Sequence, residues 1–79
     1  MSHTPHELAE EFPQDADKIH ELKMSNPHFA KLMDAYHEVN RAVHRAETGV
    51  EPVDDFTDAK MRKERMALKD EIAGMLANT

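Results

Sequence analysis

The chain has 79 residues and a mass of 9.0 kDa, enough for one small domain, and its formal net charge is −6. It contains no cysteine, so disulfides, thiol chemistry and thiolate zinc sites are excluded. Charged residues make up 33% and aromatic residues 5%, a composition typical of a solvated helical assembly and not of an enzyme with a deep apolar pocket.

Residues 1–25 are predicted to form a helical, partly flexible N-terminal arm. Thr4 and Glu7 have the spacing of a capping box, which predicts a short helix that starts at Thr4. Pro13 interrupts that helix, because the residue before a proline is pushed out of the helical region. A second helical segment is expected from Pro13 to about Met24, and it must pack on a neighbour because it has few apolar residues.

The next helix is predicted over residues 27–47. Asn26 is its expected N-cap and Pro27 occupies its first turn, where the missing N–H costs nothing. Gly49 predicts its end, since glycine enters the left-handed C-cap conformation without a steric penalty. Steps of three and four place one group of side chains on a single face, which we call the hairpin seam. On this helix the seam consists of Phe29, Leu32, Tyr36, Val39 and Val43.

The last helix is predicted over residues 55–77, with Asp54 or Asp55 as its cap. Arg65 falls within its apolar row, where its stem can cover apolar surface while the guanidinium reaches an acid. We expect Arg65 and Lys69 to set the register of the helices by ion pairs with Glu38 or Glu47. On this helix the seam consists of Met61, Leu68, Ile72 and Met75.

These patterns predict an all-α fold, an antiparallel, coiled-coil-like helical hairpin over residues 26–79 preceded by the short helical arm. Two helices bury only one seam, so Met33, Met66 and Leu76 beside it stay exposed unless residues 5–24 or a second copy cover them. Small chains often solve this problem by oligomerising. We therefore expect a homodimer with a four-helix arrangement, and a monomeric three-helix wrap is the alternative.

Six histidines raise the question of a metal site. His37 and His44 share a helical stripe, but seven residues rise about 10.5 Å, too far for one zinc ion. His3 and His6 lack a convincing third ligand, and removal of Met1 would abolish a terminal copper or nickel site at His3. With two glycines there is no phosphate loop or dinucleotide fingerprint. We predict no catalytic residue, no metal, no cofactor and no enzyme activity.

The last helix carries a strip of bases on an acidic chain. Such strips are usually solvated or paired within their own fold. We favour a self-associating protein–protein interaction or adaptor module that binds an unidentified protein partner. The alternative is a nucleic-acid-associated regulator, which the net charge and the lack of interleaved aromatic residues disfavour. The candidate partner surface comprises Lys60, Arg62, Lys63, Met66 and Lys69.

No apolar run approaches the roughly 18 residues of a membrane span, and residues 1–11 are acidic where a signal peptide would be basic and then apolar. The lack of cysteine fits a reducing compartment. We therefore expect a cytoplasmic protein with no membrane contact.

Two strings of this sequence are specific, Asn26-Pro27-His28-Phe29 and Leu68-Lys69-Asp70-Glu71-Ile72. Together with several others, they resemble the YdcH-like family of small bacterial proteins, which is catalogued as a domain of unknown function. The resemblance covers about residues 6–77 and implies a short cytoplasmic bacterial protein that is largely a helical hairpin. It implies no enzyme activity, cofactor or catalytic residue.

Overall fold

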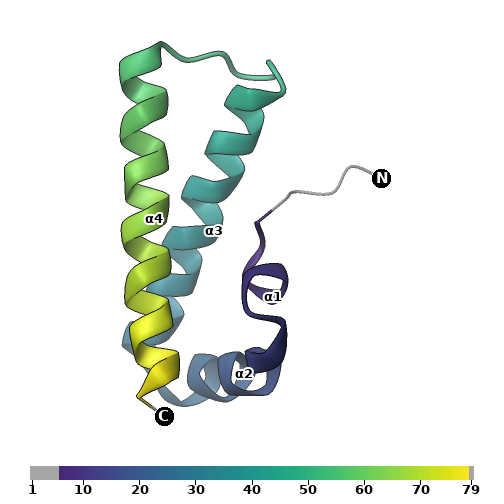
Figure 1. The fold of residues 1–79 in the computed structure, drawn as a ribbon, viewed down its shortest axis with the longest axis vertical. Helices are drawn as coiled ribbons and strands as arrows, with labels where there is room; N and C mark the ends of the chain where they lie inside the picture. Colours follow the sequence, from purple (N-terminus) through teal and green to yellow (C-terminus); the bar gives the residue numbers. More distant parts are fainter. Residues whose placement is uncertain (1–5, 79) are drawn as a thin grey trace.

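The computed structural model describes residues 6–78, whose regular secondary structure consists of helices, with no strand. The elements are α1 (Leu8–Glu11), the 3-10 turn η1 (Pro13–Asp15), α2 (Ala16–Ser25), α3 (Pro27–Glu47) and α4 (Asp55–Ala77). The long helices α3 and α4 run antiparallel, α2 lies across the end opposite their connecting loop, and α1 turns back beside α3 (Figure 1). The predicted all-α helical hairpin is confirmed.

Local capping chemistry defines the ends of the two long helices. The Asn26 side chain accepts a hydrogen bond from the backbone N–H of Phe29 at 3.2 Å, which caps α3. Gly49 follows α3 with φ of +79°, the left-handed conformation expected of a helix stop. The Asp54 side chain accepts from the backbone N–H of Thr57 at 2.6 Å and caps α4. Each cap satisfies a backbone group that would otherwise have no partner.

The start of the first helix differs from the expected one. Helix α1 begins at Leu8 with Glu7 as its N-cap residue, so Glu7 is not the third helical position of a capping box. His6 has φ of +62°, and this left-handed turn precludes a helix through it. Thr4, the predicted cap, lies outside the described residues. The Glu7 carboxylate lies 2.8 Å from His37 instead, so it joins the arm to α3.

The core lies where the N-terminal arm crosses the hairpin, at the end away from the loop. Leu8 and Ile19 of the arm are buried there and cover Met33, which is only 8% exposed. A single chain therefore buries Met33 without a second copy. A monomer whose arm wraps the hairpin as a third helix would have this arrangement. Met66 remains 66% exposed. The buried core residues are Leu8, Ile19, Phe29, Leu32, Met33, Tyr36, Ile72 and Leu76.

The hairpin is packed unevenly along its length. All five seam residues of α3 are buried, whereas on α4 Ile72 is fully buried and Met61, Leu68 and Met75 are only partly so. Near the loop, Val50 is 70% and Phe56 80% exposed. The arm covers one end of the seam, and the loop end relies on the contact between α3 and α4 alone.

Candidate functional site

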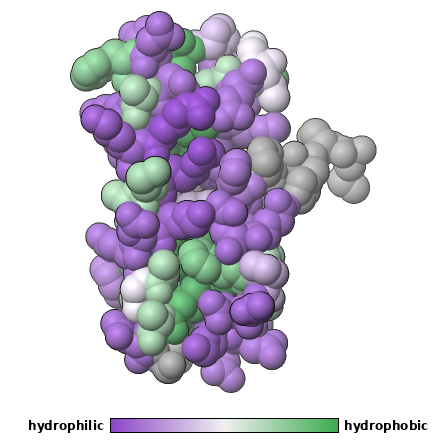
Figure 2. Space-filling model, viewed as in Figure 1, coloured by the Kyte–Doolittle hydropathy of each residue, from purple (hydrophilic) through white to green (hydrophobic). Residues whose placement is uncertain are grey.

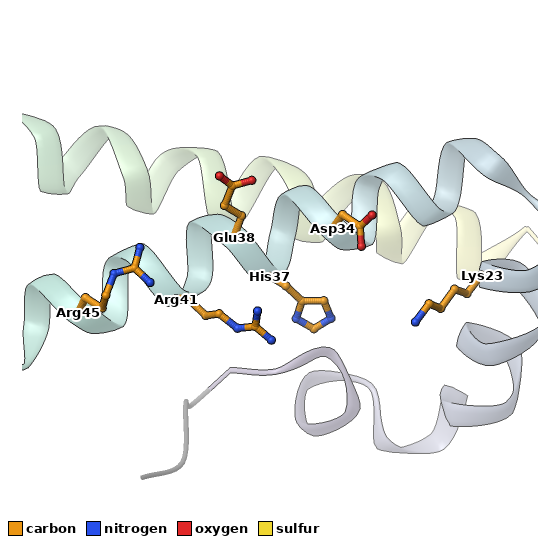
Figure 3. Close-up of a pocket in the computed structure, with 6 residues that line it drawn as sticks. All are labelled: Lys23, Asp34, His37, Glu38, Arg41 and Arg45. Atoms are coloured by element: carbon orange, nitrogen blue, oxygen red, sulfur yellow. The ribbon is translucent and has the colours of Figure 1, made fainter.

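Several open clefts border the arm, and one of them lies along the outer face of α3. It measures about 620 Å³. His37 and Arg41 extend from α3 toward the N-terminal segment, and Lys23 extends from α2 at the other end of the cleft (Figure 3). The six lining residues are Lys23, Asp34, His37, Glu38, Arg41 and Arg45.

The chemistry of this first cleft is that of a polar surface. His37 Nδ1 lies 2.8 Å from a Glu7 carboxylate oxygen, although the two are not aligned as a hydrogen bond. Arg45 Nε lies 3.2 Å from the Glu51 carboxylate. No hydroxyl or thiol nucleophile is among the lining residues, so the arrangement does not provide the nucleophile and base of acyl transfer. The cleft presents charged side chains of both signs.

The second cleft lies between the arm and α4 and measures about 490 Å³. At its centre, Lys69 donates a hydrogen bond to the Glu11 carboxylate at 3.0 Å, and His6 Nδ1 lies 3.2 Å from the same oxygen. The Lys69 hydrogen bond holds the pKa of Glu11 below its usual value. Its lining residues are His6, Glu11, Tyr36, Arg62, Arg65, Met66, Lys69 and Asp70.

Tyr36 closes the floor of the second cleft. Its ring is fully buried, and its hydroxyl donates a hydrogen bond to the backbone carbonyl of His6. Burial, reinforced by the negative charge of Glu11, raises the pKa of Tyr36 to about 12. At neutral pH the phenol is therefore protonated and acts as a hydrogen-bond donor that fastens the arm, not as a general base.

Polar contacts between α3 and α4 differ from the predicted ion pairs. Arg65 donates to the Asn40 side chain at 3.1 Å, and Lys69 reaches Glu11, so neither contacts Glu38 or Glu47 as expected. Both predicted partners were wrong because Asn40 and the arm lie closer to these two bases. An ion pair across the hairpin joins Arg62 to Glu47 at 3.0 Å.

Asn40 is the residue that sequence reasoning missed. It is 1% exposed, a buried polar side chain in the middle of the hairpin. The sequence did contain a signal for this burial. Asn40 follows Tyr36 by four residues and precedes Val43 by three, which places it on the edge of the seam. A buried amide whose partner is on the opposite helix favours one register over its alternatives.

The histidines do not form a metal site in the described part of the chain. Within residues 6–78, no three His, Asp or Glu side chains lie close enough together to hold a metal ion. His3, the centre of the terminal site considered above, lies outside those residues. Among the same residues, no helix is long and apolar enough to cross a membrane.

The comparisons with known proteins place the hairpin in a family. The model of the family described as protein of unknown function (DUF465) matches residues 29–76, which include nearly all of α3 and α4. The chain belongs to the DUF465 family. The YdcH-like proteins are part of that family, so the resemblance noted in the sequence is confirmed. No curated protein and no solved structure matches this DUF465 chain.

The candidate partner surface of this DUF465 protein is split by its own ion pairs. Arg62 contacts Glu47 and Asp58, and Lys69 contacts Glu11. In the described residues, Lys60 and Lys63 have no such partner and are exposed, as is Met66. The face shown in Figure 2 is mostly hydrophilic, with apolar areas over the loop end and over the junction of α4 with the arm. The predicted surface is therefore two free lysines and a methionine, not a continuous basic strip.

Proposed function

We propose that this protein is a non-catalytic interaction module of the bacterial cytoplasm that self-associates and presents the solvent face of α4 to another protein. The observation that carries the proposal is the exposure of large apolar side chains on that helix. Phe56 is 80% and Met66 66% exposed, although Met33 and the rest of the core are covered within one chain. Large exposed apolar side chains set among charged residues are typical of binding surfaces.

A non-catalytic role fits the state of two polar groups in the second cleft. Glu11 is held as a carboxylate by Lys69, and Tyr36 is held as a phenol by burial. Each is stabilised in the protonation state that suits a structural contact, whereas a catalytic acid or base needs a pKa near the working pH. These groups hold the arm on the hairpin.

Binding of nucleic acid is the weaker candidate. The charges of Arg62 and Lys69 are offset by carboxylates of the same chain, which leaves Lys60 and Lys63 on a protein of net charge −6. Phosphate contacts need unpaired cations and weaken steeply with salt. Retention on DNA or RNA at low salt that disappears at moderate salt would favour this candidate over the interaction module.

The test is affinity capture from a bacterial lysate with a matched pair of variants. Met66→Asp places a charge on the solvent face of α4, and Met24→Asp places the same charge on the 77% exposed end of α2. We expect a reproducible protein partner that Met66→Asp loses and Met24→Asp retains, with circular dichroism confirming that both variants fold. Equal capture by both variants would reject this face of α4, and capture of nucleic acid alone would reject the interaction module.

A further inference from the structure

The solvent face of α4 carries a second stripe, separate from the hairpin seam. Its members follow one another mostly at steps of three or four residues, so they form one line along the helix. All are exposed, and they extend over nearly the whole of α4. We call this line the outer stripe, and it consists of Phe56, Ala59, Lys63, Met66, Ala67, Asp70, Gly74 and Ala77.

The outer stripe is chemically complementary to its own reversed copy. Its spacing is symmetric about the point between Met66 and Ala67. At equal distances from that point, a positive residue corresponds to a negative one, Lys63 to Asp70. A large residue corresponds to a small one at the centre, where Met66 faces Ala67, and at the two ends, where Phe56 corresponds to Ala77.

We propose that a second copy of this chain binds the outer stripe, with α4 packed antiparallel against α4 about a two-fold axis between residues 66 and 67. The proposal rests on the self-association in the proposed function and assigns its surface and orientation. The outer stripe includes Met66, so a second copy and the protein partner compete for the same face of α4. A two-fold interface brings the same patch of both subunits together. Lys63 then lies beside the partner's Asp70, and Met66 lies over the partner's Ala67.

The alternative orientation is disfavoured by charge. In a parallel pair, each Lys63 would face the same lysine of its partner, and each Asp70 the same aspartate. Both residues are exposed, and neither forms an ion pair in the described part of the chain, so both charges are available to a second copy. In the antiparallel pair, each Lys63 instead faces the partner's Asp70, so two attractive contacts replace two repulsive ones.

The outer stripe also permits close approach of a second helix. A Cβ atom at Gly74 would meet no atom within 4 Å, so the backbone there is open to solvent. In the antiparallel pair Gly74 faces the partner's Ala59, and two small residues let the helix axes approach. One helix pair buries less than the about 1,200 Å² typical of stable complexes, so we expect association to depend on concentration.

Cysteine cross-linking tests the orientation, because the natural chain has no cysteine. Ala67→Cys lies next to the two-fold axis, where two Cβ atoms come within disulfide distance of about 4 Å. Ala59→Cys is the matched control on the same stripe, because its two copies lie about 22 Å apart along the paired helices. We expect mild oxidation to give a covalent dimer of Ala67→Cys and none of Ala59→Cys.

The other outcomes of cross-linking are equally informative. Covalent dimers of both variants would indicate parallel helices and overturn the proposal. If neither variant cross-links while light scattering gives a dimer mass for the natural chain, another face mediates association, and the self-association of the proposed function still stands. A monomer mass at every concentration would overturn both the interface and the self-association.

Charge reversal tests the ionic contact separately. Lys63→Glu and Asp70→Lys should each raise the dissociation constant of the dimer by about tenfold, because each turns two attractions into repulsions. The double variant restores opposite charges across the two-fold axis, and we expect its dissociation constant to return to that of the natural chain. A double variant no tighter than the single ones would overturn the pairing of these residues.

Discussion

The Lys69 ammonium donates a hydrogen bond to the Glu11 carboxylate at 3.0 Å and so joins the last helix to the first. These residues are 58 positions apart in the chain. Together with the Tyr36 hydroxyl, which binds the His6 carbonyl, this contact holds the arm over the core. The same arm covers Met33, so the strength of these contacts controls how much apolar surface the hairpin exposes.

The Glu11 contact predicts a dependence of stability on acid. The hydrogen bond from Lys69 lowers the pKa of folded Glu11 below the ordinary value of 4.5. The contribution of this contact to the free energy of unfolding is therefore fully present above pH 4.5. It is lost as the pH falls through the lower pKa of Glu11 in the folded state. Glu11→Gln should lower the free energy of unfolding by about 0.5 kcal/mol at neutral pH, since the pair is partly exposed.

Urea denaturation of the natural chain and Glu11→Gln at several pH values measures this effect. The difference between the two should shrink in acid, because protonation of Glu11 breaks the same contact that the variant lacks. Glu21→Gln, an exposed site on α2, is the matched control and should differ little from the natural chain at any pH. A difference that stays constant down to pH 2 would be incompatible with the contact.

The burial of Tyr36 predicts that the protein becomes less stable at alkaline pH. The pKa of Tyr36 is about 12 in the folded chain and about 10 in the unfolded one, so the folded state loses stability as the pH rises between these values. Ultraviolet absorbance of the phenolate should show titration near pH 12 in the native chain and near 10 in denaturant. Titration near 10 in both would mean that the ring is not buried as described.

Tyr36→Phe tests the hydrogen bond to the arm. The variant keeps the buried ring and removes the hydroxyl, which leaves the His6 carbonyl without this donor. We expect a loss of about 1 kcal/mol in the free energy of unfolding at neutral pH. The added loss between pH 10 and 12 should disappear, because phenylalanine has no proton to release. Thermal denaturation at neutral and alkaline pH provides both measurements.

The seam predicts contrasting effects of neighbouring substitutions on α3. Val39→Asp buries a charge at a site that is 9% exposed and should cost about 3 kcal/mol or more, enough to abolish most helicity in so small a chain. His37→Ala removes the contact with Glu7 and leaves the seam intact, so helicity should remain nearly unchanged. Circular dichroism compares the two, and equal tolerance would show that the heptad assignment is wrong.

Alanine substitutions at the two glycines should change the free energy of unfolding in opposite directions. Gly49→Ala introduces a side chain at φ of +79° and should cost about 1 kcal/mol. Gly74→Ala lies inside α4 with open space around it and should stabilise the monomer by about 0.5 to 1 kcal/mol. Chemical denaturation at low protein concentration, where any dimer has dissociated, measures both. Stabilisation by Gly49→Ala would contradict the C-cap.

The hairpin was predictable because its determinants are local. The caps at Asn26 and Asp54, the stop at Gly49 and the three-four spacing of apolar residues act over a few positions, and the structure contains each of them. The outer stripe was equally present in the sequence. Its exposure became evident only when the seam had been assigned to the opposite face of α4.

The long-range polar contacts were not predictable in the same way. Arg65 and Lys69 lie on the expected helix, but their partners are Asn40 and Glu11 because the rotation of α4 and the path of the arm bring these groups closest. The short first helix failed to start at the predicted cap because His6 adopts a left-handed turn. The partner that a side chain contacts, and the residue at which a short helix starts, depend on small differences in packing. A local sequence pattern does not encode these differences.

By itself, the sequence determined that this chain forms two long amphipathic helices joined by a glycine-containing break, and it determined membership of the DUF465 family, since the matched segment is the hairpin. Only the tertiary structure decided that the arm covers Met33, that Tyr36 is a buried donor and that half of the basic strip is neutralised. Helix periodicity is encoded within a few residues, whereas burial and ion pairing depend on which distant segments meet.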